Sequence, residues 1–469
     1  MLIKGVIKLN DTNALFETAS ISHALRKMCI PTIISQLIIL IYNIADTWYI
    51  GRTNNHYMVA ALSLVSTVYL MLSALANLFG VGGGSLAVRL MGIHDEEEAK
   101  KVSNYSFIMS IICAGVFSLF CFVFMTPMLR FLGASDDTLN YARQYLMFVV
   151  VIGGIPTVLA NTMSFMVRNI GYSHEAGFGL SMGGLLNVFL DPLFMFVILP
   201  DGFQVMGAAI ATMLSNFIVC IYFFNVYIKS DSDILMIPRR FESIRRDSVK
   251  SLFLVGIPAA LSLFLFDLTN IVINKLSAMH GDYELAAIGI VLKVERLPLN
   301  IGIGICLGMV PLVAYNYAQG NKKRMLDFFK TARTYGLIVS IISVVLYYVL
   351  APYIINIFIN DATTIDYGTL YLRRRCFATP FMFLSFHMVH FFQSVDEGPY
   401  SLLLAVIRQL CLNIPILFIF NALFGMNGVV LTQVTADILN VIASYMIFYY
   451  AIRFITTKPQ FQSFQQIDS

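Results

Sequence analysis

About twelve long apolar stretches dominate this sequence, and each is long enough to cross a lipid bilayer. A membrane helix needs about 20 mainly apolar residues. The stretches lie at 28–50, 58–79, 105–128, 140–164, 177–199, 205–228, 252–279, 285–312, 334–359, 370–394, 401–423 and 428–452. Only 12% of residues are charged, about half the fraction of a soluble chain. Such a chain has too little polar surface for a water-soluble globule, so we expect an all-α membrane protein with twelve transmembrane helices.

The sequence lacks the features of several other classes of protein. A net charge of +4, spread along the chain, gives no reason to expect nucleic acid as a partner. The seven cysteines are scattered without a CxxC pair, so we expect neither a zinc site nor a redox pair. The run "GVGGGS" at 80–85 lacks the GK[ST] of a phosphate loop and predicts close helix packing instead. With no ATPase, hydrolase or metalloprotease motif, we expect neither an enzyme nor a bound cofactor.

The basic residues predict the orientation of the chain in the membrane. Cytoplasmic loops of membrane proteins carry an excess of Lys and Arg. If residues 1–27 are cytoplasmic, the basic cluster of 239–250 and the basic segment 322–333 lie on that same side. Both termini are therefore expected on the cytoplasmic side of the membrane. The run Arg373–Arg375, near the outer end of its span, is an exception to this pattern.

Two similar halves follow one another along the chain. The segment that starts at Tyr42 pairs with the segment that starts at Phe266, and "GAAIAT" at 207–212 pairs with "GVVLTQ" at 428–433. Two six-helix halves of the same orientation form a parallel repeat, which places a substrate site between them. The expected segments are an N-terminal segment 1–27, an N-lobe 28–228, a linker 229–250, a C-lobe 251–455 and a tail 456–469.

Two carboxylates stand out among the apolar residues of the first half. They are Asp46 in "YNIADTWYIG" and Asp191 in "LLNVFLDPLFMF". A charged side chain at bilayer depth costs roughly 2.5–3.5 kcal/mol, so such residues are typical of functional sites. Asn187 lies four residues before Asp191 on the same helix face, and Thr212 and Asn216 repeat that spacing. These groups suit a proton site or a small hard cation. Helix capping, or a buried cation as partner, is the alternative explanation for each aspartate.

The second half holds a more mixed set of ionisable residues. They are Asp267, Lys293, Glu295 and Arg296, followed by His387 and His390. Glu295 could simply neutralise Lys293 or Arg296. His387 and His390 are three residues apart but lack a third strong ligand, so we expect no metal site there. Pro31 interrupts the first apolar stretch, where it either allows a bend of the helix or serves packing alone.

The motifs taken together resemble the multidrug and toxic compound extrusion (MATE) family. "DTWYIG" resembles the family's D-T-x-x-x-G signature and "NVFLDP" its N-x-x-L-D-P motif, while "GAAIAT", "PLVAYNYAQGN" and "LFGMNGVVLTQVTAD" resemble later motifs. The similarity runs from about Pro31 to Tyr450, and the second-half loops are most similar to a bacterial branch of multidrug pumps. The order and spacing of the motifs make the set specific.

The resemblance implies a V-shaped bundle of two six-helix lobes that exports organic cations in exchange for inward H⁺ or Na⁺. By position, Asp46, Asn187, Asp191 and Thr212 match the family's N-lobe ion site, where Na⁺ is an alternative to H⁺. Pro31 matches the proline at which the first helix bends in some members. Asp267 and Glu295 match acidic C-lobe positions of other branches, but His387 stands where those branches have a further acid. We therefore expect coupling in the N-lobe, with the C-lobe positions as a secondary candidate.

The sequence leaves three functions open. The first is a secondary active transporter that exports cationic drugs or dyes, acting as a monomer in the lipid bilayer. Two nearby carboxylates cannot both ionise at low cost, so they would share protons and release a cation when protonated. The second is a lipid-linked oligosaccharide flippase of the same superfamily, which needs a cationic cavity for its phosphates. The third is a membrane scaffold or receptor that transports nothing, and the doubled fold with its buried acids disfavours it.

Overall fold

Helices make up nearly all of the structure, a computed structural model that describes residues 14–53, 55–238 and 240–461. Within those ranges no residue belongs to a strand. In the first half the helices are α2 (Ile21–Gly51), α3 (His56–Gly92), α4 (Glu96–Val123), α5 (Met125–Phe131), α6 (Asp136–Leu146), the π-helix η1 (Met147–Ile152), α7 (Gly154–Asn169), α8 (Ser173–Pro192), the π-helix η2 (Leu193–Ile198) and α9 (Gln204–Lys229). In the second half they are α10 (Arg246–Ser277), α11 (Asp282–Gln319), α12 (Lys322–Asn356), α13 (Ala362–Arg375), the 3₁₀-helix η3 (Cys376–Ala378), α14 (Thr379–Ser394), α15 (Gly398–Val406), the π-helix η4 (Ile407–Asn413), α16 (Ile414–Phe424) and α17 (Met426–Ile455).

Every apolar stretch of the sequence coincides with one of these helices or with a consecutive series of them. Among the described residues, ten helices are long and apolar enough to cross a membrane. An eleventh span consists of 136–152 and 154–169, which meet at an angle of 50°. The stretch 370–394 comprises the end of α13, η3 and α14, and its arginines make it less apolar than the others. The chain is therefore an integral membrane protein built from helices.

The helices group into two units, one for each half of the sequence. Of the described residues, the first unit contains those of 14–19 and 34–260, and the second contains those of 20–33 and 261–461. Two helices therefore change unit along their length: α2 between residues 33 and 34, and α10 between residues 260 and 261. The limits predicted above for the lobes, linker and tail stay predictions.

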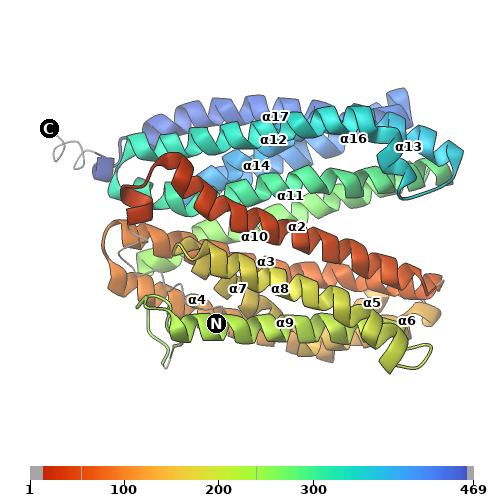
Figure 1. Cartoon of the computed structure of the whole chain (residues 1–469), viewed down its shortest axis with the longest axis horizontal. Coiled ribbons are helices and arrows are strands. Elements are labelled where there is room, and N and C mark those ends of the chain that lie inside the picture. The colour runs from red at the N-terminus through yellow and green to blue at the C-terminus, as the bar shows by residue number, and fades with distance from the viewer. Residues whose placement is uncertain (1–13, 54, 239, 462–469) are drawn as a thin grey trace. The chain divides into compact units, whose positions relative to one another are not determined.

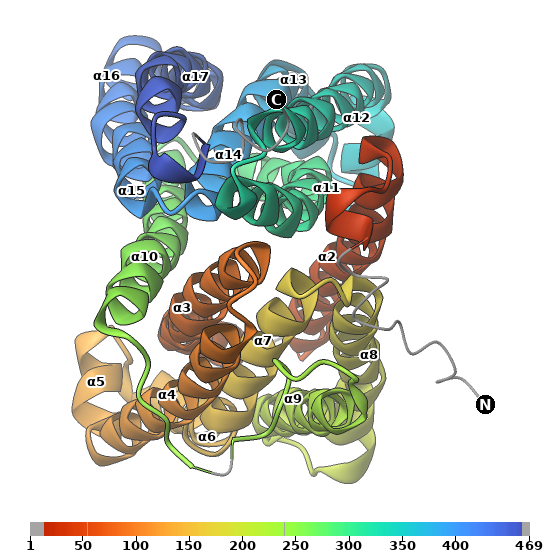
Figure 2. The same ribbon diagram turned by 90° about the vertical axis from the view of Figure 1, so that its left-hand side faces the viewer.

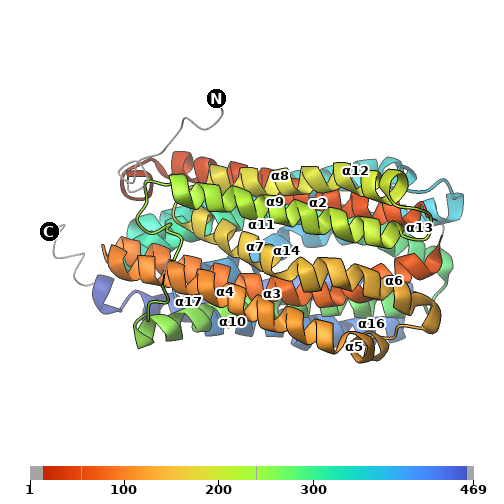
Figure 3. The same cartoon turned by 90° about the horizontal axis from the view of Figure 1, so that it is seen from below.

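In the first unit, α3, α4, α7, α8 and α9 run side by side (Figure 1). Figure 2, which looks along these helices, shows them gathered into one bundle, and α4, α7 and α9 are also adjacent in Figure 3. A cluster of buried apolar side chains fills the interior, including Val65, Leu72 and Leu146. The second unit is built in the same manner, with α11 against α12, α13 and α14, and with α17 against α14 and α16.

Glycines bring helix backbones into direct contact in both units. In the first unit, a Cβ on Gly82 would lie 2.4 Å from the carbonyl oxygen of Leu252, and one on Gly256 would lie 2.2 Å from that of Leu78. The start of α10 therefore packs closely on α3. In the second unit, Cβ atoms on Gly304 and Gly308 would meet the backbone of α2 at 2.8 Å. The glycine run of 80–85 thus serves close helix packing, as expected from its sequence.

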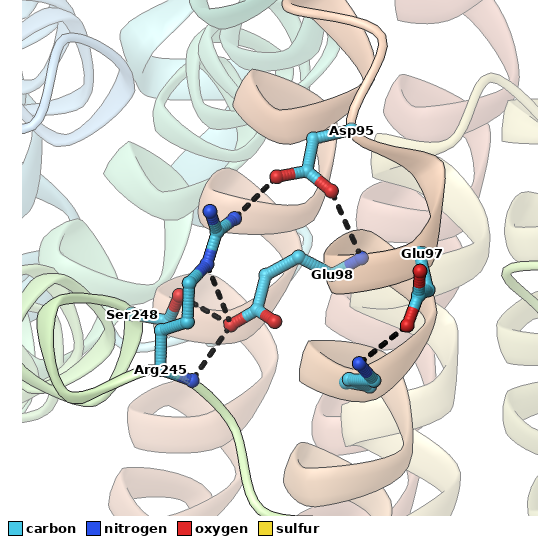
Figure 4. A network of polar contacts seen from close by, with 6 residues as sticks. Asp95, Glu97, Glu98, Arg245 and Ser248 are labelled. Carbon is cyan, nitrogen blue, oxygen red and sulfur yellow. Dashed lines mark hydrogen bonds and ion pairs between the residues drawn. The ribbon is translucent and has the colours of Figure 1, made fainter.

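A polar network joins α4 to the start of α10 (Figure 4). The buried carboxylate of Glu98 accepts hydrogen bonds from the backbone N–H of Arg245 at 2.8 Å and from the Ser248 hydroxyl at 2.7 Å. Arg245 also forms an ion pair with Asp95, and this hydrogen bond raises the pKa of the Arg245 guanidinium. Asp95 caps α4 by accepting from the backbone N–H of Glu98 at 3.2 Å. The network therefore attaches the beginning of α10 to the first unit.

Candidate functional site

The carboxyl group of Asp191 lies in the interior of the first unit, close to the end of α8. Its side chain has no exposed surface. Asn187, one turn earlier in α8, donates a hydrogen bond of 3.3 Å to Oδ1 of Asp191. The same amide nitrogen lies 3.2 Å from Oγ1 of Thr212 on α9. Three of the four residues that the sequence predicted for the ion site are therefore in contact.

Asp46 approaches this group from α2. Its side chain is half-buried, and it lies within range of a direct electrostatic interaction with Asp191. The two helices can come close because α8 has a glycine at position 184, where a Cβ would lie 2.9 Å from Ile38 and 3.2 Å from the ring of Tyr42. The structure thus brings Asp46 to the group formed by Asn187, Asp191 and Thr212.

Neither aspartate has a cationic partner. Among the described residues, neither Asp46 nor Asp191 forms an ion pair, and Oδ1 of Asp46 and Oδ2 of Asp191 are buried without a hydrogen-bond partner. A buried polar atom without a partner is unfavourable, and an isolated buried carboxylate more so. The two carboxyl groups therefore suit the uptake of a proton or of a small cation. The two alternative explanations, a helix cap and a buried cation, find no support in these contacts.

Three tyrosines surround the aspartates, and sequence reasoning did not identify them. Tyr42 and Tyr145 lie within electrostatic range of both Asp46 and Asp191, and Tyr69 lies within range of Asp46. Tyr42 precedes Asp46 by four residues, so helical spacing could have revealed it. Tyr69 and Tyr145 come from other helices, and the sequence contains no signal that would place them here.

Further polar side chains lie next to these tyrosines. Tyr42 lies beside Tyr69, and Tyr69 lies beside Asn216. The amide of Asn216 donates to the hydroxyl of Thr157 on α7 at 2.9 Å. Hydroxyl and amide groups of α2, α3, α7 and α9 thus lie next to one another beside the aspartates. Such groups can supply oxygen ligands for a cation or carry a proton.

The candidates of the second half each have a partner of their own. The buried carboxylate of Glu295 is paired with Arg375, with three nitrogen–oxygen distances of 2.9, 3.2 and 3.0 Å. The alternative that Glu295 neutralises a cation therefore holds, but its partner is Arg375 from α13 and not Lys293 or Arg296, whose side chains are exposed. This pair also explains one arginine of the exceptional run at 373–375.

The remaining candidates of the second half do not join Glu295. Asp267 is half-buried, with one oxygen 3.9 Å from Arg296. His387 is fully buried with its ring stacked on Phe329 at 4.4 Å between centroids. His390 hydrogen-bonds the carbonyl oxygen of Phe386 at 2.8 Å. No group of three or more His, Cys, Asp or Glu side chains that could hold a metal ion occurs in the part of the chain that the structure describes.

The sequence analysis did not predict one buried ion pair of the second half. Arg408 on η4 and Asp437 on α17 are both buried, and Nε of Arg408 lies 2.7 Å from Oδ1 of Asp437. Both residues are charged groups within apolar stretches, a signal that the sequence does contain. Pro31, the predicted bending point, lies within α2 three residues before that helix passes from the second unit to the first.

Comparison with known proteins agrees with this architecture. The family model described as MatE matches residues 31–193 and 258–419. Multidrug export protein MepA of Staphylococcus aureus (strain MRSA252) is 29% identical over 436 residues, which are 92% of this chain and 95% of the relative. MepA of Staphylococcus saprophyticus is likewise 29% identical over 437 residues.

Solved structures have the same fold. One shows the outward-facing conformation of a multidrug resistance MATE family transporter, with a TM-score of 0.89 and 23% identity, and the match covers 97% of this chain and 99% of that one. Another is a transporter of the MOP superfamily from Pyrococcus furiosus, described as having a binding pocket of reversed polarity. It has a TM-score of 0.84 and 23% identity, with 92% of this chain and 97% of that one covered. The predicted fold of twelve helices in two lobes is thereby confirmed.

Proposed function

Because this chain belongs to the MatE family of transporters, we propose that it exports organic cations across the bacterial plasma membrane in exchange for inward H⁺ or Na⁺. The relatives at 29% identity are multidrug export proteins, which supports multidrug efflux here. The coupling site consists of Asp46, Asn187, Asp191 and Thr212. The transporter uses H⁺ or Na⁺ as its coupling ion without a cofactor, and it acts as a monomer.

The observation that carries the proposal is the uncompensated charge of the first unit. Asp191 is fully buried and its only hydrogen-bond donor among the described residues is Asn187. In the second unit, by contrast, the buried acids Glu295 and Asp437 each have an arginine. A cation or proton that enters the first unit therefore finds unpaired carboxyl groups, whereas one that enters the second unit must displace an arginine.

Exchange follows from competition for these carboxyl groups. When Asp191 and Asp46 are deprotonated they attract a cationic substrate, and when a proton or Na⁺ occupies them they release it. The proton gradient supplies roughly 1.4 kcal/mol per pH unit, and the membrane potential roughly 2.3 kcal/mol per charge per 100 mV. One proton per cycle can thus concentrate a substrate about tenfold for each pH unit.

The orientation of the chain rests on its basic residues. With both termini in the cytoplasm, the clusters at 239–250 and 322–333 lie on the cytoplasmic side, as the bias of membrane proteins requires. The arginines at 373–375 remain an exception to this pattern, and among the described residues only Arg375 of the three has a carboxylate as its partner. Arg375 binds Glu295, Arg373 donates to the carbonyl oxygen of Tyr348 at 3.0 Å, and Arg374 contacts Asn427.

The experiment is uptake of a cationic dye into inverted vesicles under separately imposed H⁺ and Na⁺ gradients. We expect uptake with at least one gradient and none with Asp191→Asn, which keeps the shape of the side chain but cannot titrate. Vesicles with that variant at equal expression are the control. Uptake of an anionic or lipid-linked phosphate compound, with no response to cationic dyes, would show that the chain is a flippase instead.

A further inference from the structure

The second unit contains a polar site at positions that correspond to those around Asp191. The paired segments 207–212 and 428–433 align Thr212 with Gln433, and one turn later Asn216 with Asp437. Before each segment stands a pair of polar residues four apart. In the first half this pair is Asn187 and Asp191, and in the second half it is Gln409 and Asn413.

The contacts repeat along with the positions. In the second unit the later residue is the donor: the amide of Asn413 donates to Oε1 of Gln409 at 3.2 Å, whereas in the first unit the earlier residue, Asn187, donates to Asp191 at 3.3 Å. Thr269 of α10 adds a hydrogen bond of 2.9 Å to the same oxygen of Gln409. Both halves therefore hold a hydrogen-bonded polar pair at this place, with donor and acceptor exchanged.

The charges, however, are arranged differently. The positions of Asp191 and Asp46 are occupied by Asn413 and Asn270, which carry no charge. The buried carboxylate next to these matched positions is Asp437, one turn after Gln433, and its side chain has no exposed surface. Its Oδ2 accepts from the amide of Gln433 at 2.6 Å, and its Oδ1 accepts from Nε of Arg408 at 2.7 Å.

Arg408 is held at this position from several sides. Its guanidinium carbon lies 4.8 Å from the centroid of the Phe386 ring and 6.0 Å from that of Phe266, which corresponds to Tyr42 of the first half. A cation above an aromatic ring is stabilised by the electrons of the ring. The side chain is 4% exposed, so water does not compete for its charge.

We propose that Arg408 is a built-in cation that occupies the second unit's counterpart of the coupling site and thereby confines ion exchange to the first unit. Carboxylate, amide and hydroxyl oxygens are the ligands that small hard cations prefer. Asp437 supplies the carboxylate, and the amide of Gln433, which stands at the position of Thr212, lies 2.6 Å from its Oδ2. An arginine attached to the chain cannot leave, so the site does not cycle between free and loaded states.

This inference rests on the proposed function only in assigning exchange to the first unit. Its structural part, that Arg408 stands where a free cation would otherwise bind, can be tested without transport. Asp191→Asn serves as the background for all variants, because it removes the competing site of the first unit. The purified protein is unfolded by heat in NaCl and in choline chloride at equal ionic strength and at alkaline pH, with Na⁺ as the probe.

Arg408→Gln in this background should acquire stabilisation by Na⁺, with a midpoint of unfolding about 3 °C or more higher in NaCl than in choline chloride. The background protein and Arg408→Lys, which keeps the positive charge, should show no such difference. Asp437→Asn added to Arg408→Gln should abolish it, because the carboxylate that would bind Na⁺ is gone.

Equal midpoints of Arg408→Gln in the two salts would overturn the proposal. The proposal would also be overturned if the Arg408→Gln/Asp437→Asn protein folds while the Arg408→Gln protein folds in neither salt. That result would mean that Na⁺ cannot compensate the charge of Asp437. If neither variant folds, the thermal stability of Arg408→Lys is the measurement that decides. A stable Lys variant supports a requirement for charge, and an unfolded one shows that the site needs the shape of the guanidinium. Failure of dye transport by the wild type affects none of these results.

Discussion

Arg375 binds both carboxylate oxygens of Glu295 in the interior of the second unit, and the two residues are 80 positions apart in the chain. The side chains are 2% and 7% exposed, so almost no water reaches the pair. Asp191 of the first unit is equally buried but has no arginine or lysine beside it among the described residues. This contrast separates a carboxylate with a fixed counterion from one without, and it is the reason for assigning the proposed ion exchange to Asp191.

Glu295→Gln should strongly destabilise the protein, because it leaves the buried charge of Arg375 without a counterion. Removal of one partner of a buried pair costs roughly 3–5 kcal/mol. The effect is measured as a lower midpoint of thermal unfolding in detergent. The double variant Glu295→Gln/Arg375→Met should recover much of the loss. The matched control is Asp267→Asn, whose partner Arg296 is 48% exposed at 3.9 Å, and which should cost at most about 1 kcal/mol. Equal losses in the two single variants would contradict this.

Asp191→Asn should give a folded, membrane-inserted protein that no longer transports. The change keeps the side chain's shape and lowers the cost of burying it, so loss of stability is not the expected cause. Efflux of a cationic dye is measured at matched expression, and the purified protein is checked for monodispersity. Asp46→Asn should act similarly but retain some transport, because Asp46 is only half-buried. Asp267→Asn should matter less. Normal transport by Asp191→Asn together with none by Asp267→Asn would place the ion site in the second unit.

Gly308→Ala and Gly289→Ala, both within α11, should change stability in opposite directions. A Cβ on Gly308 would lie 2.7 Å from the sulfur and 2.8 Å from Cα of Cys29, so α2 would have to move away. Such overpacking costs roughly 1–3 kcal/mol. A Cβ on Gly289 would meet nothing within 4 Å. Alanine there should stabilise the helix by roughly 0.5–1 kcal/mol. Thermal unfolding of the two variants decides, and a gain in stability for Gly308→Ala would refute the close contact of α2 and α11.

Glu98→Ala should destabilise the protein more than Arg245→Ala does. Glu98 is buried, and its loss leaves the Ser248 hydroxyl and the Arg245 backbone N–H without their acceptor, at a cost of roughly 1–3 kcal/mol. The side chain of Arg245 is 57% exposed, so its ion pair with Asp95 is worth at most about 1 kcal/mol and weakens with salt. Unfolding midpoints at low and high NaCl test both statements. An Arg245→Ala loss that is larger, or that persists at high salt, would contradict them.

Single cysteines in a cysteine-free background should report the orientation of the chain. A cysteine at Glu242, an exposed residue before α10, should react with a membrane-impermeant maleimide only from the cytoplasmic side. One at Asp201, exposed beside Gly202 between η2 and α9, should react only from outside. Labelling of position 242 on intact cells would reverse the proposed topology.

The sequence by itself determined everything that depends on one helix at a time. The lengths of the apolar stretches predicted the spans, and the helical repeat placed Asn187 one turn from Asp191, where the structure shows their hydrogen bond. The motifs "DTWYIG" and "NVFLDP" led to the family. Regular spacing along a helix is a local property, so it can be read without knowing how helices pack.

Only the tertiary structure decided which side chains meet across helices. Nothing in the order of residues shows that Arg375 belongs to Glu295, that Arg408 belongs to Asp437, or that Tyr145 lies near Asp46. Such contacts depend on the rotation of each helix about its axis and on how closely two backbones approach. Both are decided by many small packing terms, including glycines such as Gly184. The sequence therefore located the charged residues, and packing decided which of them have a counterion among the described residues and which do not.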